Sequence, residues 1–113
     1  MKEKISYSEF EQVDIRVGTI ISAELNENLH KPSIILQIDF GNKLGIKKSS
    51  AQLTKNYNPT NLINKQVAAV VNFPSKQIGH LLSEVLVLGF PDMEGEPILV
   101  TSDKKVANGG SLY

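Results

Sequence analysis

Lysines are concentrated in the middle of this 113-residue sequence, where seven of them occur between residues 31 and 76 against a single acid, Asp39. Ammonium groups can contact successive phosphates, whose charge supplies most of the affinity of proteins for nucleic acids. Serine hydroxyls and side-chain amides in the same stretch add neutral donors for an anion or a base edge. The residues that we expect to face a nucleic acid are Lys47, Lys48, Ser49, Lys55, Lys65, Asn72, Lys76 and Gln77.

An ordinary solvated surface would give a similar pattern, because lysines decorate most soluble proteins. The chain has one arginine, Arg16, which limits bidentate recognition of phosphates and bases. Of its three tyrosines only Tyr57 lies in the basic stretch, so stacking on single strands would be sparse. From the charge pattern alone, both interpretations stay open.

Residues suited to catalysis are few and scattered. His30 and His80 are isolated, and neither has an acid at a ligand-like spacing. The sequence has no cysteine, and no phosphate-binding loop or nucleophile elbow occurs in it. Glu94 and Glu96 fall in a stretch typical of a solvated loop. We therefore expect no enzyme activity, no metal site and no cofactor.

The net charge is zero, from 12 basic and 12 acidic side chains. This balance would normally count against a nucleic-acid partner. It is an average, however, of +6 over residues 31–76 and −3 over each flank. The longest apolar stretch, 67–71, has five residues, and because no apolar run follows the N-terminal charges we expect no signal peptide. We expect one cytoplasmic domain over residues 1–113, without membrane insertion.

Short apolar runs separated by Gly, Asn and Pro predict an all-β fold. In the second run, Ile34, Leu36, Ile38 and Phe40 alternate with polar residues and so share one face. Gly18 indicates a bulge or bend. The predicted strands cover 15–21, 34–40, 44–48, 66–73 and 85–88, with a shorter run at 98–100. The layout is that of a five-stranded OB-fold Greek-key barrel with short flanking helices and a C-terminal extension.

Two capping boxes predict those helices. Ser8 and Glu11 would cap a helix over about 8–13, with Phe10 and Val13 facing the barrel. Ser49 and Gln52 would open a connecting helix that Asn58-Pro59 ends. The first N–H groups of this second helix would then assist Ser49 in binding an anion.

The run Asp14-Ile15-Arg16-Val17-Gly18-Thr19-Ile20 resembles the opening strand of the tRNA-binding-domain family of OB-folds. Glu84-Val85 separates the chain from synthetase-appended relatives, which carry Gly-Met there, and is similar to the CsaA-type export-related chaperones. The further stretches that resemble this CsaA branch are 38–41, 45–52, 62–67, 70–74 and 83–89.

The resemblance implies a homodimer whose C-terminal extension, about 91–113, lies at the subunit interface. It also implies two binding activities: structured RNA, especially tRNA, on the basic barrel face, and unfolded or pre-secretory polypeptides in an apolar groove. The alternative is a free-standing tRNA-binding protein or an accessory module of tRNA metabolism.

The sequence departs from this family where relatives are often basic. It has Ser75-Lys76-Gln77 after Pro74, and Gly79-His80-Leu81-Leu82 before Ser83. These changes remove positive charge and add apolar surface, which favours polypeptide binding. The residues expected to contact a polypeptide are Phe73, Ile78, Leu81 and Leu82, although core packing is an alternative for the two leucines.

Overall fold

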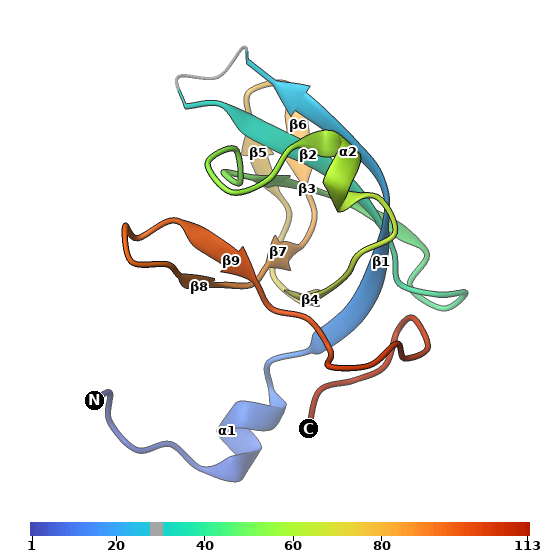
Figure 1. Ribbon diagram of the computed structural model, residues 1–113. Coiled ribbons are helices and arrows are strands. Elements are labelled where there is room, and N and C mark those ends of the chain that lie inside the picture. Colours follow the sequence, from blue (N-terminus) through green and yellow to red (C-terminus); the bar gives the residue numbers. More distant parts are fainter. Residues whose placement is uncertain (28–30) are drawn as a thin grey trace.

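The computed structural model describes residues 1–27 and 31–113, so His30 lies outside the described residues (Figure 1). Two short helices accompany nine strands in these ranges. The helices are α1 (Tyr7–Glu11) and α2 (Pro59–Leu62). The strands are β1 (Ile15–Asn26), β2 (Ser33–Asp39), β3 (Ile46–Ala51), β4 (Gln66–Val70), β5 (Lys76–Ile78), β6 (Leu81–Ser83), β7 (Leu86–Val87), β8 (Gly89–Pro91) and β9 (Pro97–Leu99).

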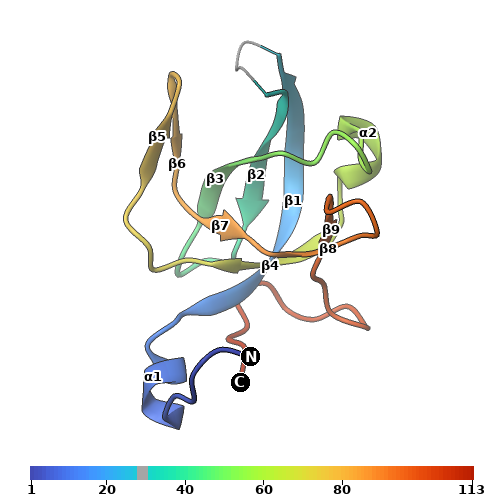
Figure 2. The ribbon, with the colours of Figure 1, turned by 90° about the vertical axis from the view of Figure 1, so that its left-hand side faces the viewer.

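Five strands form one antiparallel sheet in the order β3-β2-β1-β4-β7, and this sheet curls into a half-barrel (Figure 2). The long strand β1 pairs with β2 along its second half and with β4 along its first. The bulge lies between Ile20 and Ser22 rather than at Gly18. The N–H of Glu84, in the link between β6 and β7, donates to the carbonyl oxygen of Lys48 on β3 at 2.8 Å. The all-β, OB-like prediction is confirmed.

The concave face of the sheet carries the core. Ile34, Leu36, Ile38 and Phe40 are fully or almost fully buried, as their alternation predicted. Gly18 lies against them, because a Cβ there would be 2.6 Å from Ile38 Cγ2 and 2.8 Å from Phe40 Cδ1. Glycine at this position lets two strands approach closely, which explains its presence better than a bend does.

The N-terminal helix begins earlier than predicted, because Ser6 rather than Ser8 caps it. The Ser6 hydroxyl accepts from the Glu9 N–H at 3.1 Å, and the Glu9 carboxylate accepts from the Ser6 N–H at 3.0 Å. The bond from the Ser6 N–H to the carboxylate, followed by a smaller contribution from the Ser6 side chain, lowers the pKa of Glu9. Ser8 is already inside the helix. Phe10 is half-buried and Val13 is exposed, so α1 packs only loosely on the barrel.

The connecting helix also differs from the prediction. Ser49 and Ser50 belong to β3, where Ser49 pairs with Leu36 on the buried face. The Asn58 side chain accepts from the Asn61 N–H at 3.0 Å, and Pro59 opens the helix. Asn58-Pro59 therefore begins α2, in agreement with the preference of proline for the first helical turn. The connecting helix thus begins ten residues after Ser49 and not at it.

The second half of the chain contains two hairpins, β5–β6 and β8–β9. The first of them replaces an expected loop, and β4 ends at Val70 before it. The last residues return along β1: the Gly109 N–H donates to the Val17 carbonyl at 2.7 Å, and the Leu112 N–H donates to the Ile15 carbonyl at 2.8 Å. Part of the C-terminal extension thus completes the edge of β1 within the same chain.

Candidate functional site

A groove of about 390 Å³ lies where the β5–β6 hairpin meets the barrel. Two hydrogen bonds hold the hairpin there: the Glu84 N–H reaches Lys48 at 2.8 Å, and the Ser50 N–H reaches the Ser83 hydroxyl at 3.1 Å. We call this feature the hairpin groove. Its lining includes Ser50, Phe73, Lys76, Ile78, Glu84 and Leu86.

Much of the hairpin groove is apolar. Phe73 is 52% exposed and Leu86 is 49% exposed, while Ile78 is half-buried. The free energy falls when another molecule covers side chains of this size. Two of the predicted polypeptide contacts, Phe73 and Ile78, therefore lie in one concave surface.

The other two predicted polypeptide contacts are on the hairpin itself. Leu81 pairs with Ile78 and is half-buried. Leu82 pairs with Gln77, on the opposite face of the hairpin, and is 48% exposed. Since alternate residues of a strand point to opposite faces, Leu82 does not extend the surface that Ile78 and Leu81 share.

A carboxylate reduces the positive charge beside the groove. The Glu84 carboxylate accepts from the Lys48 N–H at 3.0 Å and lies 4.0 Å from the Lys47 ammonium. Lys76 also lines the groove, and Lys48 is exposed on the opposite face of β3 from Lys47. Lys47 and Lys48 thus point to opposite faces of β3, and Glu84 lies beside Lys47 in the same groove lining as Lys76.

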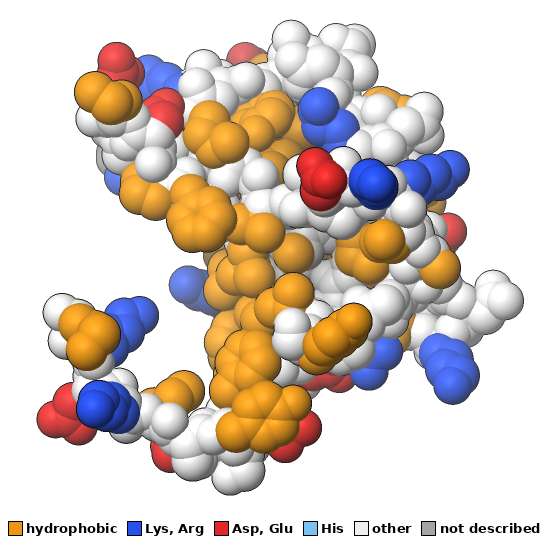
Figure 3. All heavy atoms as spheres, turned by 60° about the horizontal axis from the view of Figure 1, so that its bottom comes forward, with side chains coloured by type: hydrophobic (Ala, Val, Ile, Leu, Met, Phe, Trp, Pro, Cys, Tyr) orange, Lys and Arg blue, Asp and Glu red, His pale blue; other side chains and the backbone are white. Residues whose placement is uncertain are grey.

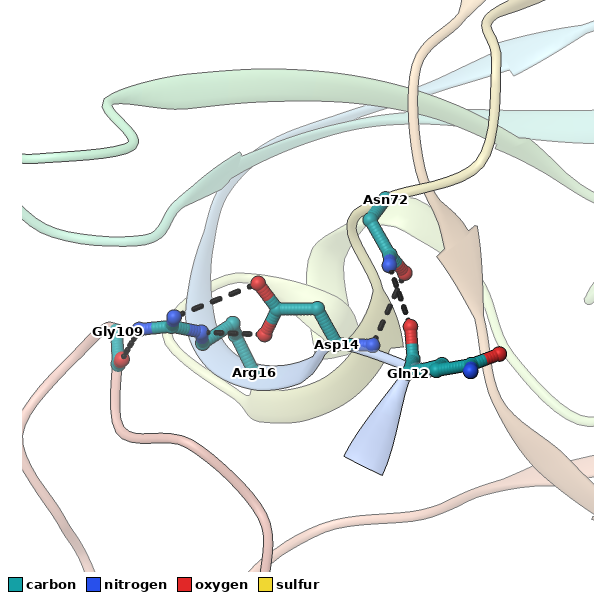
Figure 4. Close-up of polar contacts among 5 residues, drawn as sticks. All are labelled: Gln12, Asp14, Arg16, Asn72 and Gly109. Carbon is teal, nitrogen blue, oxygen red and sulfur yellow. Dashed lines mark hydrogen bonds and ion pairs between the residues drawn. The ribbon is translucent and has the colours of Figure 1, made fainter. Parts of the chain in front are cut away.

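Three of the polar residues predicted to contact a nucleic acid are either buried or already hydrogen-bonded within the chain. Ser49 is only 2% exposed, so the prediction that its hydroxyl meets an anion is corrected. The Asn72 side chain accepts from the Asp14 N–H at 2.9 Å and donates to the Gln12 carbonyl at 2.8 Å (Figure 4). Gln77 is exposed, and its amide donates to the carbonyl of Gly79 at 2.9 Å.

The remaining two predicted lysines lie elsewhere. Lys55 is exposed on the link between β3 and α2. Lys65 precedes β4, whereas Lys76 follows it, and the Lys65 carbonyl accepts from the Ile20 N–H at 2.9 Å. The eight residues therefore do not form one continuous face.

Arg16 on β1 forms an ion pair with Asp14 and also a hydrogen bond to the C-terminal segment, contacts that the sequence did not single out (Figure 4). The Arg16 Nε donates to Asp14 Oδ1 at 2.6 Å, and its Nη1 donates to the Gly109 carbonyl at 3.0 Å. The hydrogen bond with Asp14 raises the pKa of the guanidinium further. The spacing of Asp14 and Arg16, two residues apart at the start of an extended segment, was the available signal.

Within the described ranges, no three His, Asp or Glu side chains gather closely enough to hold a metal ion. No helix in those ranges is long and apolar enough to cross a membrane.

Residues 15–111 match the family described as "Putative tRNA binding domain". The chain belongs to this tRNA-binding-domain family. Its fold is also similar to two solved structures of CsaA chaperones. The CsaA of Bacillus anthracis str. Ames is 42% identical with a TM-score of 0.92, and the match covers 98% of this chain and 100% of that one. The CsaA of Picrophilus torridus is 44% identical with a TM-score of 0.89, covering 97% and 100%.

Synthetases contain related sequence as part of longer chains. A methionine–tRNA ligase from Methanococcoides burtonii is 32% identical over 112 residues, which are 99% of this chain. The chain spans only about 16% of the length of the curated ligases that it matches. The ligase reaction belongs to those longer proteins.

Proposed function

We propose that this chain is a CsaA-like, non-catalytic binding protein that holds unfolded or pre-secretory polypeptides as a homodimer and also presents a tRNA-binding surface. The observation that carries the polypeptide activity is the hairpin groove. Its exposed Phe73 and Leu86 and its half-buried Ile78 offer an apolar surface to a client. The cytoplasm is the compartment in which such clients and tRNA occur together.

Backbone pairing would add to this apolar burial. The β5–β6 hairpin forms a sheet of two strands, so β5 has one strand neighbour among the described residues. An extended polypeptide can pair with such an edge, while its side chains enter the adjacent groove. Main-chain bonds are indifferent to sequence, which suits a protein that accepts many clients.

The homodimer would form on the face that carries the chain termini. Figure 3 shows a band of hydrophobic side chains across this face. Leu112 is 54% exposed, and Ile5 and Tyr7 are 64% and 69% exposed. A second copy covering this face would remove exposed apolar side chains from water and give the assembly two grooves, with a gain in avidity.

The polypeptide activity is tested by the aggregation of an unfolded client at low molar ratios of the protein. We expect suppression that changes little with added salt, because apolar burial is not screened by ions. Loss of suppression on adding salt would contradict apolar burial as the main attraction. Light scattering of the protein alone, at each salt concentration, gives the oligomeric state.

The second candidate is a protein that acts primarily on tRNA, and the family match favours it. Lys47, Lys48 and Lys76 beside the hairpin groove would contact RNA phosphates. Charge reversal of Lys47 and Lys48 together should then weaken binding across many RNA sequences. Unchanged affinity in this double variant would remove the β3 lysines from the RNA interface.

A further inference from the structure

One glutamine fastens both ends of an exposed loop in the C-terminal extension. The side chain of Gln66 accepts from the Val106 N–H at 3.0 Å and donates to the Val106 carbonyl at 2.7 Å. Its backbone carbonyl accepts from the Thr101 hydroxyl at 2.6 Å. The same amide group also lies 3.2 Å from Asn108 Oδ1. The loop between Thr101 and Val106 is therefore fixed at both ends to the first residue of β4.

This attachment brings together lysines that are far apart in the sequence. Lys65 immediately precedes Gln66, and Lys105 immediately precedes Val106. Lys104 immediately precedes Lys105 in the loop, and all three lysines are exposed. We call Lys65, Lys104 and Lys105 the loop patch. In the sequence, Lys104 and Lys105 belong to the acidic flank, so their place beside Lys65 comes only from the fold.

The loop patch keeps its positive charge. Within the described residues the ion pairs are Arg16–Asp14 and Lys47–Glu84, so no carboxylate there pairs with a patch lysine. Asp103 is the one acid within the loop, and it is exposed to solvent. Unpaired ammonium groups on a fixed loop suit a polyanion, because little conformational entropy is lost when they bind.

We infer that the loop patch is a phosphate-binding surface for the backbone of a structured RNA, separate from the hairpin groove. This inference rests on the tRNA-binding part of the proposed function and names a further part of its interface. Lys65 and Lys76 lie beyond opposite ends of β4. An RNA seated on the loop patch would therefore leave the apolar groove open to a polypeptide.

The test is a salt titration of bulk tRNA binding to the wild-type chain and to the double variant K104E/K105E. Removing one lysine–phosphate interaction lowers the slope of log affinity against log salt by about 0.7 to 0.9. We expect the slope of the double variant to be lower by roughly 1.5. The matched control is K2E/K4E, which makes the same change in net charge on the exposed N-terminal residues. It should leave the slope close to that of the wild type.

A second variant releases the loop from β4 without changing the charge of the loop patch. In Gln66→Leu all three lysines remain, but the side-chain bonds to Val106 are absent. We expect a weaker tRNA affinity with most of the client suppression retained, and circular dichroism checks that the variant is folded. An unchanged slope in K104E/K105E, or an equal loss in K2E/K4E, would overturn the loop patch while leaving tRNA binding intact. If the wild-type chain binds no tRNA at low salt, both the loop patch and the tRNA-binding proposal are wrong.

Discussion

The hairpin groove and the loop patch differ in the side chains that surround their lysines. Beside the groove, the carboxylate of Glu84 lies 4.0 Å from the ammonium of Lys47, and apolar side chains form much of the lining. In the patch, Lys65, Lys104 and Lys105 are exposed and have no acidic partner in the described part of the chain. One surface therefore suits an apolar chain, and the other suits a phosphate backbone.

This difference changes the meaning of the neutral net charge. Among the described residues, the sum of zero combines Lys47, which has a carboxylate neighbour, with lysines that have none. Counting charge along the sequence assigned Lys104 and Lys105 to an acidic segment, whereas Gln66 holds their loop beside a lysine of the basic segment. Charge must be counted over a surface, since the fold decides which residues share one.

The largest effect is expected from a change that destroys the scaffold common to both surfaces. A Cβ at Gly18 would lie 2.6 Å from Ile38 Cγ2, so Gly18→Val forces β1 away from the core. We expect a loss of about 3 kcal/mol in the free energy of unfolding, as severe overpacking costs. Urea denaturation measures it. Gly110→Ala is the control, because a Cβ there meets its neighbours at an ordinary 3.5 Å.

Both binding activities should fall together in Gly18→Val at temperatures where the variant unfolds. Retention of one activity by the unfolded chain would mean that this activity needs no folded surface, and the two surfaces could then no longer be compared as parts of one fold.

The next effect concerns the groove alone. Phe73→Ala removes an aromatic side chain that is 52% exposed in the free protein and would be covered by a client. We expect client affinity to fall about tenfold, corresponding to about 1.5 kcal/mol of lost apolar burial. Aggregation assays with an unfolded client measure the change, and tRNA titrations should not change.

Ile46→Ala serves as the control for Phe73, because Ile46 is 54% exposed on β3 and outside the groove lining. Equal losses in the two variants would show that the client binds exposed apolar residues in general.

A smaller effect is expected from removing the acid among the β3 lysines. Glu84→Gln keeps an oxygen for the Lys48 N–H, but removes the charge facing Lys47. If this charge keeps RNA off the groove, tRNA affinity should rise a few-fold and the salt slope should steepen by about 0.8. An unchanged slope would mean that RNA does not approach this side even when it is more basic.

The sequence predicted the parts of the fold that follow from local patterns, but not the parts that depend on contacts between distant residues. The alternation of Ile34, Leu36, Ile38 and Phe40 is a local pattern, and the structure confirms that face as core. The capping residues were misplaced, because Ser49 follows the same alternation as a strand residue opposite Leu36. A Ser-x-x-Gln pattern cannot distinguish a cap from a strand without knowing the partner strand.

The candidate sites were harder to predict, because they depend on contacts between distant segments. Phe73 and Ile78 were expected at a groove, and the short hairpin brings them there. Asn72 was expected to meet a base edge, but its amide is bonded to Asp14 and Gln12. The grouping of Lys65 with Lys105 arises from a bond between residues 66 and 106, which no local pattern reveals.

The smallest effect should come from a carboxylate outside both surfaces. Asp92 accepts from the N–H groups of Glu94 and Glu96 and from the Asn56 side chain, at 2.8 to 2.9 Å. These bonds, that of Asn56 first, lower its pKa below the ordinary 3.8. Its contribution to stability is thus complete above the unfolded pKa and is lost as the pH falls through the lower, folded pKa.

Asp92→Asn should therefore lower the melting temperature slightly at neutral pH, and the difference from the wild type should narrow as the pH falls below 3.8. Asp103→Asn, at an exposed aspartate with no hydrogen bond among the described residues, is the control for stability. If the difference in melting temperature stays the same down to pH 2, the effect of Asp92→Asn comes from packing and not from the charge of Asp92. Client and tRNA binding should be unchanged in Asp92→Asn.

The central claim is that polypeptide and RNA occupy different surfaces, and competition between them tests it most directly. A fluorescent unfolded client is bound to the wild-type chain, and bulk tRNA is added to saturation at low salt. With separate surfaces, we expect that the client stays bound, and that raising the salt then releases the tRNA but not the client. Displacement of the client by tRNA in proportion to the RNA bound would contradict the claim, because a single surface would then serve both ligands.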